Sequence, residues 1–194
     1  MSPARTRPPL ARFCPHCGTP LVPQDDHGVD RPTCVACGFI AYQNPAPAVG
    51  VILEKKGSIV LVRRRYEPQV GLWGLPAGFM EYGEAPEETA VREALEETGL
   101  RIEVDRLHGA YRGGGPTGPR IVLLVYRAHI LGGRLRPGDD ADEVGWFELT
   151  KLPELAFRSH DRALREYHRD LRRAAGATPA RSARTRTGTP RSGR

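Results

Sequence analysis

The sequence predicts an α/β protein, in which a domain of strands and helices follows a small cysteine-rich unit. Short apolar runs bounded by turn residues alternate with stretches of helical character, which is typical of helices packed on a sheet. Four cysteines in two Cys-x-x-Cys pairs precede the first apolar run, and this spacing is typical of a metal-binding module. A chain of 194 residues has room for one ordinary domain and one small unit.

The formal net charge of +6 belongs to the two ends of the chain. Residues 1–12 and 173–194 are rich in arginine and poor in apolar side chains, so we expect both ends to be disordered. The remainder is mildly acidic, which makes nucleic acid an unlikely partner. No apolar run approaches the roughly 18 residues of a membrane helix, and the first residues lack the apolar segment of a signal peptide. We therefore expect no membrane association and a cytoplasmic location.

Residues 13–42 predict a structural zinc ribbon. Cys14 and Cys17 form one pair, Cys34 and Cys37 form the other, and a glycine that eases a tight turn follows each pair. Four thiolates suit tetrahedral zinc and leave no open position for a substrate. A unit of this size cannot fold on its apolar surface alone, so Zn²⁺ would supply its folding energy. A rubredoxin-like iron site and a pair of disulfides are the alternatives.

The main domain is expected at residues 48–172, after a proline-punctuated linker at 43–47. Residues 71–83 predict a loop. A helix should then run from Pro86, which a first turn tolerates, to Gly99, a typical C-terminal stop. Apolar runs predict strands, and an amphipathic pattern predicts a closing helix. The strands are expected at 49–53, 59–65, 101–111, 121–130 and 144–149, and the closing helix at 160–173.

The expected helix concentrates carboxylates on one side. At 100° per residue, apolar side chains share one face, and acidic side chains gather roughly opposite. The apolar set is Ala90, Val91, Ala94 and Leu95, and the acidic set is Glu93, Glu96 and Glu97. Such a cluster suits a hard divalent cation, because Mg²⁺ and Mn²⁺ prefer oxygen ligands. A solvated acidic helix face is the alternative.

The stretch from Gly78 to Leu100 resembles the signature of the Nudix hydrolases. Every fixed position of that signature is matched, by Gly78, Glu84, Arg92, Glu93, Glu96, Glu97, Gly99 and Leu100. Ala94 is a soft departure, since the family usually has a bulkier aliphatic residue there. The resemblance implies an α/β/α sandwich with a mixed sheet, and metal-dependent hydrolysis of the pyrophosphate bond of a nucleoside diphosphate derivative.

The resemblance also implies roles for the matched residues. Glu93 and Glu97 would be the principal ligands of Mg²⁺ or Mn²⁺, with Glu96 as a further ligand. The backbone carbonyl of Gly78 would complete the metal site. The metal would neutralise charge on the pyrophosphate and lower the pKa of a water that attacks phosphorus.

A supporting ion pair and a general base complete the catalytic residues that the resemblance implies. Arg92 and Glu84 would form the ion pair that orients the cluster. The base stays open between a glutamate of the signature and an acid of a later loop, where Asp140 and Glu143 are favoured. A solvated acidic loop is the alternative for those two residues.

A zinc ribbon, this linker and this domain together resemble the ADP-ribose and FAD pyrophosphatases, and more distantly the NADH pyrophosphatases. The resemblance implies a small nucleotide substrate, either ADP-ribose or FAD, and a homodimer. Cleavage of NADH or of the NAD cap of RNA is an alternative, although the chain lacks the Ser-Gln-Pro-Trp-Pro-Phe-Pro motif of the NADH enzymes. A non-catalytic ligand sensor with a zinc-ribbon adaptor is an alternative of another class.

Three residues are candidates for substrate selection. Pro116 resembles the proline placement of ADP-sugar hydrolases, though its loop is rich in proline and glycine. Arg64 ends an expected strand, where it would meet phosphate or solvent. Phe157 would stack on adenine or pack in the core.

Overall fold

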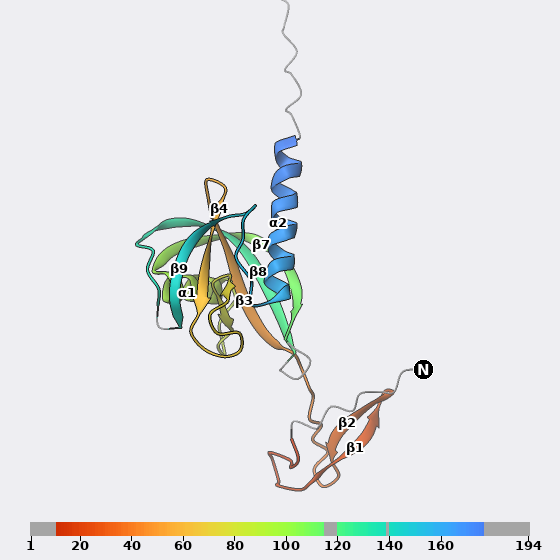
Figure 1. The fold of residues 1–194 in the computed structure, drawn as a ribbon. Helices are drawn as coiled ribbons and strands as arrows, with labels where there is room; N and C mark the ends of the chain where they lie inside the picture. Colours follow the sequence, from red (N-terminus) through yellow and green to blue (C-terminus); the bar gives the residue numbers. More distant parts are fainter. Residues whose placement is uncertain (1–10, 115–119, 139, 177–194) are drawn as a thin grey trace, which may run out of the picture. The chain divides into compact units, whose positions relative to one another are not determined.

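The computed structural model describes residues 11–114, 120–138 and 140–176. The chain divides into two compact units, residues 1–46 with 114–121 and residues 47–113 with 122–194, and each is described by itself. Figure 1 shows the ribbon with the elements labelled. The expectations for Pro116 and for most of the two chain ends fall outside the described residues.

The first unit is built on one antiparallel hairpin. Strand β1 (Leu21–Asp26) pairs with β2 (Val29–Cys34), and Asp26 lies opposite Val29. The two turn residues, His27 and Gly28, both have left-handed backbone, with φ of 53° and 82°. A two-residue turn of this kind matches the twist of the strands it joins. The hairpin leads directly into the second cysteine pair, because Cys34 is the last residue of β2.

The second unit contains a seven-stranded sheet. Its path is β5-β4-β3-β8-β7, with β6 added to β3 and β9 added to β4. The strands are β3 (Ala46–Lys55), β4 (Ser58–Arg64), β5 (Trp73–Gly74), β6 (Ala77–Phe79), β7 (Leu100–Gly113), β8 (Ile121–Gly133) and β9 (Ala141–Glu148). The five expected strands are confirmed. The expected loop at 71–83 contains the two short strands β5 and β6, which are too short for a pattern of alternation to reveal.

Helices α1 (Pro86–Thr98) and α2 (Arg158–Gly176) cover opposite faces of this sheet. Tyr126 of β8 donates its hydroxyl to Glu87 of α1 at 2.9 Å. Its neighbour Arg127 lies over the ring of Tyr167 of α2, 4.8 Å from the centroid. Successive side chains of a strand point to opposite faces, so the sheet lies between the helices (Figure 1). The predicted α/β/α sandwich with a mixed sheet is confirmed.

Helix α1 begins and ends as its sequence indicates, but it buries a different face. Glu88 accepts a hydrogen bond from the Ala85 N–H at 2.8 Å at the start, and Gly99 ends the helix with φ of 70°. Of the four apolar residues expected to share one face, Ala90 and Ala94 are buried, whereas Val91 and Leu95 are 39% and 49% exposed. Burial does not follow the apolar face as a whole, because Glu93 of the acidic set is itself only 9% exposed.

The core under α1 holds the helix against β3, β4, β7 and β8. It is formed by Val51, Leu53, Val60, Ala94, Leu100, Ile102 and Ala128. The apolar area that these side chains remove from water stabilises the unit and fixes the position of α1 on the sheet. Within the described residues, no helix is both long enough and apolar enough to cross a membrane.

Candidate active site

The centre of the site is the contact between Gly78 of β6 and Glu93 of α1. Gly78 lies opposite Val49 in the sheet. A Cβ placed on Gly78 would stand 2.0 Å from Oε1 of Glu93, so any larger residue would displace the carboxylate. Burial raises the pKa of Glu93, and the adjacent Arg92 partly offsets that effect. The structure therefore brings a buried carboxylate directly against backbone, a close approach that glycine permits.

Glu97 lies one helical turn further along and contacts the same strand. Its Oε2 accepts a hydrogen bond from the Ala77 N–H at 2.8 Å. Burial, together with the nearby charges of Glu93 and Asp140, raises the pKa of Glu97 to about 8, although the hydrogen bond from the Ala77 N–H acts in the opposite direction. Without a cation, this group is costly to ionise.

Arg92 ties the acidic residues together. Its guanidinium donates to both carboxylate oxygens of Glu84, at 2.7 and 2.9 Å, and to Oε1 of Glu93 at 2.6 Å. It also reaches Oε2 of Glu96 and the Phe79 carbonyl, each at 3.0 Å. The bond from Arg92 lowers the pKa of Glu84 to about 2. The structure thus brings Glu84 and Arg92 together as the sequence predicts.

The glutamates of α1 are near one another but are not gathered around one point. Within the described residues, only the four cysteines form a group of three or more metal-ligand atoms close enough to share an ion. Arg92 holds Glu93 and Glu96, and Ala77 holds Glu97. Carboxylates repel each other unless a cation lies between them, and the guanidinium supplies the compensating charge here. Oxygen donors of this kind, next to a glycine backbone, match the preferences of Mg²⁺ and Mn²⁺.

Of the two loop acids, Asp140 acts on the carboxylates through its charge, and Glu143 is paired elsewhere. Asp140 raises the pKa of both Glu93 and Glu97 through its charge. The preceding loop packs on the end of α1, where the Gly138 N–H donates to the Glu97 carbonyl at 3.2 Å. Glu143 lies opposite Arg63 in the sheet and forms an ion pair with it at 3.2 Å.

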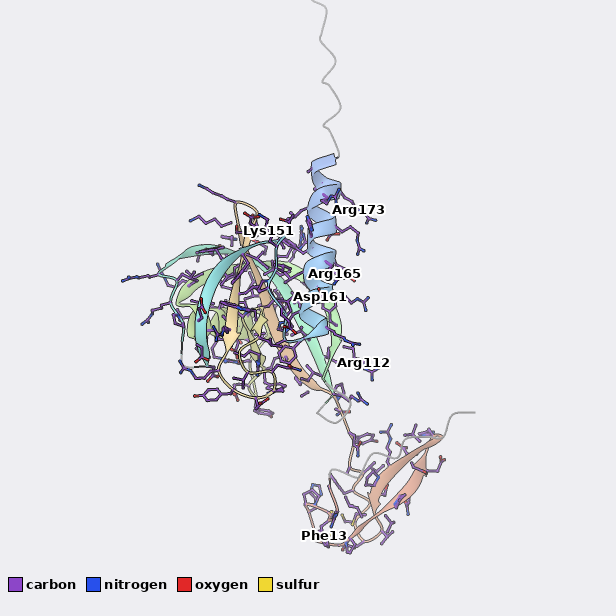
Figure 2. All side chains as sticks on the ribbon, in the orientation of Figure 1. Phe13, Arg112, Lys151, Asp161, Arg165 and Arg173 are labelled. Carbon is purple, nitrogen blue, oxygen red and sulfur yellow. The ribbon has the colours of Figure 1, made fainter. Side chains whose placement is uncertain are left out.

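Arg64 and Phe157, which the sequence singled out separately, lie together. The guanidinium of Arg64 lies over the ring of Phe157, 5.0 Å from the centroid, and donates to the Pro68 carbonyl at 2.8 Å. Its charge also lowers the pKa of Glu97. Phe157 lines an open groove of about 470 Å³ at the start of α2. Asp161 and Arg165, an ion pair at 2.9 Å, also line this groove, and Figure 2 labels both residues on α2.

The structure adds one residue that the sequence analysis missed. His160 of α2 is 5% exposed and its Nδ1 accepts a hydrogen bond from the Leu75 N–H at 3.0 Å. Burial lowers the pKa of His160 to about 4. The signal was present, because His160 shares helical spacing with the buried Ala163, Leu164 and Tyr167. A polar residue on the buried face of a helix indicates that a hydrogen-bond partner is buried with it.

The cysteine quartet of the first unit is arranged for one metal ion. Its four Sγ atoms lie within 4.8 Å of one another. Cys14 and Cys37 are 3.5 Å apart, as are Cys17 and Cys34. These separations are too long for disulfides, in which sulfurs lie about 2.05 Å apart. They match a tetrahedral site, where zinc–sulfur bonds of about 2.3 Å place sulfurs about 3.8 Å apart. The geometry therefore favours one metal ion over two disulfides.

Fold and site together define a class of protein: an α/β/α domain whose first helix presents linked arginine and glutamate side chains to a glycine-bearing strand. Comparison with known sequences agrees. Residues 44–168 match the family described as NUDIX domain. The chain belongs to the Nudix family.

Named relatives and a solved structure extend the comparison. An ADP-ribose pyrophosphatase of Methanocaldococcus jannaschii is 42% identical over 130 residues, which are 66% of this chain and 76% of that protein. The NAD-capped RNA hydrolase NudC of Pseudomonas aeruginosa is 34% identical over 86% of this chain, and the chain spans only 58% of that protein. The crystal structure of a Nudix hydrolase from Nitrosomonas europaea has a TM-score of 0.70 and 35% identity, over 82% of this chain and 93% of that one. These relatives support a pyrophosphohydrolase.

Proposed function

We propose that the chain hydrolyses the pyrophosphate bond of a nucleoside diphosphate joined to another group, with ADP-ribose as its leading substrate and FAD as the next. The observation that carries this proposal is the contact of the buried Glu93 carboxylate with the backbone at Gly78, where a Cβ would stand 2.0 Å from the carboxylate. Arg92 offsets only part of the cost of ionising this buried carboxylate, and a bound cation would offset the rest.

Glu93, Glu97 and the carbonyl of Gly78 would hold Mg²⁺ or Mn²⁺, with Glu96 as a further ligand. When bound, the cation supplies charge neutralisation for the pyrophosphate oxygens and activates a water. The remaining work is done by the chain itself. Arg92, which is anchored by Glu84, holds the other carboxylates in place. Positioning of this kind, together with electrostatics, dominates the catalysis of phosphoryl transfer.

Asp140 is the general base that we favour over Glu143. Asp140 is close enough to Glu93 and Glu97 to raise the pKa of both. Glu143 instead neutralises Arg63, and its side chain is 57% exposed. A base must lie within hydrogen-bond reach of the proton it removes, which favours the acid nearer the glutamates.

Two observations support an ADP-linked substrate. The M. jannaschii relative is named as an ADP-ribose pyrophosphatase and is matched over 76% of its length. Arg64 is a cation whose charge acts on Glu97, and it lies over the ring of Phe157 beside an open groove. We propose that Arg64 contacts the pyrophosphate and that Phe157 contacts the base of the substrate.

Cleavage of NAD or of an NAD cap is the second candidate. It is favoured by the match to NudC over 86% of this chain, which extends further than the match to the archaeal enzyme. The absence of the Ser-Gln-Pro-Trp-Pro-Phe-Pro motif argues against it. The intact set of clustered glutamates argues against a non-catalytic sensor, because a pure binding site gains nothing from such repulsion.

The cysteine quartet would hold structural Zn²⁺. Four thiolates complete the coordination of the ion and leave no place for substrate water. Free thiols in this arrangement suit a reducing compartment, and we propose the cytoplasm.

A substrate panel tests the proposal. The full chain, loaded with zinc, is incubated with Mg²⁺ or Mn²⁺ and ADP-ribose, FAD, NADH, coenzyme A or nucleoside triphosphates, and the products are separated by chromatography. We expect AMP from ADP-ribose at the highest kcat/KM. A strong preference for triphosphates would overturn the ADP-linked assignment, and no turnover of any member would overturn the activity.

A further inference from the structure

The chain crosses between two strands of the sheet immediately before Gly78. Strand β5 pairs with β4 through Gly74, and β6 pairs with β3 through Ala77. Leu75 and Pro76 lie between these pairings, and neither is a register partner of a residue in β3 or β4. Leu75 is 2% exposed. A buried backbone N–H or carbonyl without a partner is strongly unfavourable, so the crossover needs partners from elsewhere.

Two hydrogen bonds from other elements reach the crossover. The Pro76 carbonyl accepts a hydrogen bond from the Val51 N–H at 3.0 Å, and proline has no N–H of its own. The Leu75 N–H donates to Nδ1 of His160 at 3.0 Å, and this bond is buried. His160 thus supplies the acceptor for the crossover from the far helix of the fold, α2.

The fit of His160 to the crossover is close. A Cβ on Gly74 would stand 3.1 Å from Nδ1 of His160, so glycine at this position leaves room for the ring. The phenyl ring of Phe157 packs edge-on against the imidazole, with centroids 5.1 Å apart. Nδ1 acts as the acceptor, so the proton of the neutral ring lies on Nε2. The ring is therefore oriented by packing as well as by its hydrogen bond.

We propose that His160 is a positioning residue for the metal site. It fixes the Leu75 N–H and thereby the path of residues 75–78. At the far end of this segment, the Ala77 N–H donates to Glu97, and Gly78 lies against Glu93. Loss of the Nδ1 acceptor lets the crossover shift and moves the Gly78 backbone relative to both glutamates. This inference rests on the proposed metal site, but not on the identity of the substrate.

Three variants separate positioning from simple destabilisation. His160→Leu removes the acceptor, whereas His160→Asn keeps an acceptor oxygen near the place of Nδ1. Tyr111→Phe is the matched control, because it removes a 2.8 Å bond from β7 to Glu166 of α2 without touching the crossover. Manganese binding without substrate is measured for each by the electron paramagnetic resonance signal of free Mn²⁺.

Loss of a residue that orients metal ligands weakens metal binding by roughly 10–100-fold. We expect the dissociation constant for Mn²⁺ to rise by that factor in His160→Leu, and to stay within about threefold of the parent in His160→Asn and Tyr111→Phe. Activity should follow as a higher Mn²⁺ requirement with little change in the KM for ADP-ribose. Equal weakening in His160→Leu and Tyr111→Phe would overturn the proposal, because it would indicate general loosening of α2.

Amide hydrogen exchange gives a readout independent of metal and activity. We expect the Leu75 and Ala77 amides to exchange faster in His160→Leu than in the parent, and His160→Asn to restore slow exchange. Unchanged protection of both amides in His160→Leu would overturn the proposal. If the parent fails to hydrolyse any nucleotide but these exchange and Mn²⁺ results are obtained, the proposed function fails and the positioning role stands.

Discussion

The buried imidazole of His160 predicts a pH dependence of stability whose sign and size follow from its surroundings. The side chain is 5% exposed, and burial, reinforced by the charge of Arg64, lowers its pKa to about 4. The unfolded chain binds this proton at the ordinary histidine pKa of about 6.5. Between these two values the unfolded state holds more protons than the folded state. The contribution is therefore fully present above about pH 6.5 and is lost as the pH falls toward about 4.

The magnitude follows from the two pKa values. At about 1.4 kcal/mol for each pKa unit, the whole difference corresponds to about 3 kcal/mol. Between about pH 7.5 and about pH 5, linkage gives a loss of about 2 kcal/mol in the free energy of unfolding from this one residue.

Urea unfolding of the parent and of His160→Asn at these two pH values measures the effect. Both tryptophans of the chain, Trp73 and Trp146, lie in the second unit, so their fluorescence follows that unit alone. Asparagine keeps an acceptor for Leu75 but does not titrate, so the loss on acidification should be about 2 kcal/mol smaller in the variant. Equal losses in parent and variant would refute the assignment of a buried, neutral imidazole.

Three further predictions concern the two proposed metal sites and the proposed general base. Gly78→Ala places a Cβ 2.0 Å from the Glu93 carboxylate, so kcat/KM for ADP-ribose should fall by roughly 10–100-fold. In the control variant Gly176→Ala, the added Cβ would meet nothing within 4 Å, so kcat/KM should equal that of the parent. Equal values of kcat/KM for Gly78→Ala and Gly176→Ala would count against the proposed metal site. Asp140→Asn should lower kcat by on the order of 100-fold or more, as loss of a general base does, while Glu143→Gln leaves it nearly unchanged; the reverse result would reassign the base. Elemental analysis should find one zinc ion for each cysteine quartet. A thiol reagent should react with the cysteines only after a chelator has removed the zinc. Purified protein that is red, or whose thiols react at once, would contradict the zinc assignment.

The sequence was sufficient to predict the elements whose patterns are local. The long strands, the start of α1 at Pro86 and its end at Gly99 follow from apolar runs and from the backbone preferences of single residues. The contact between Arg92 and Glu84 was implied by the resemblance to the Nudix signature, in which both positions are fixed. These features need no knowledge of what packs against them.

The features that the sequence did not predict depend on packing partners distant in the chain. Val91 and Leu95 were expected on one apolar face with Ala90 and Ala94, yet these two side chains are exposed and Glu93 is buried. Helical periodicity shows which residues share a face, but it does not show which face a metal site requires to be buried. His160 was missed for the same reason, since its partner, the Leu75 N–H, is 85 residues away and needs an acceptor only because the chain changes strands there.

The most direct test of the central claim is the turnover of ADP-ribose by Glu93→Gln and Glu97→Gln at saturating Mn²⁺. Each substitution keeps the shape of the side chain and removes the charge that would hold the cation. We predict a loss in kcat of on the order of 100-fold or more for both, while Glu88→Gln, on the same helix at its N-terminus, remains close to the parent. Parental rates in Glu93→Gln and Glu97→Gln would contradict the claim that these two carboxylates form the catalytic metal site.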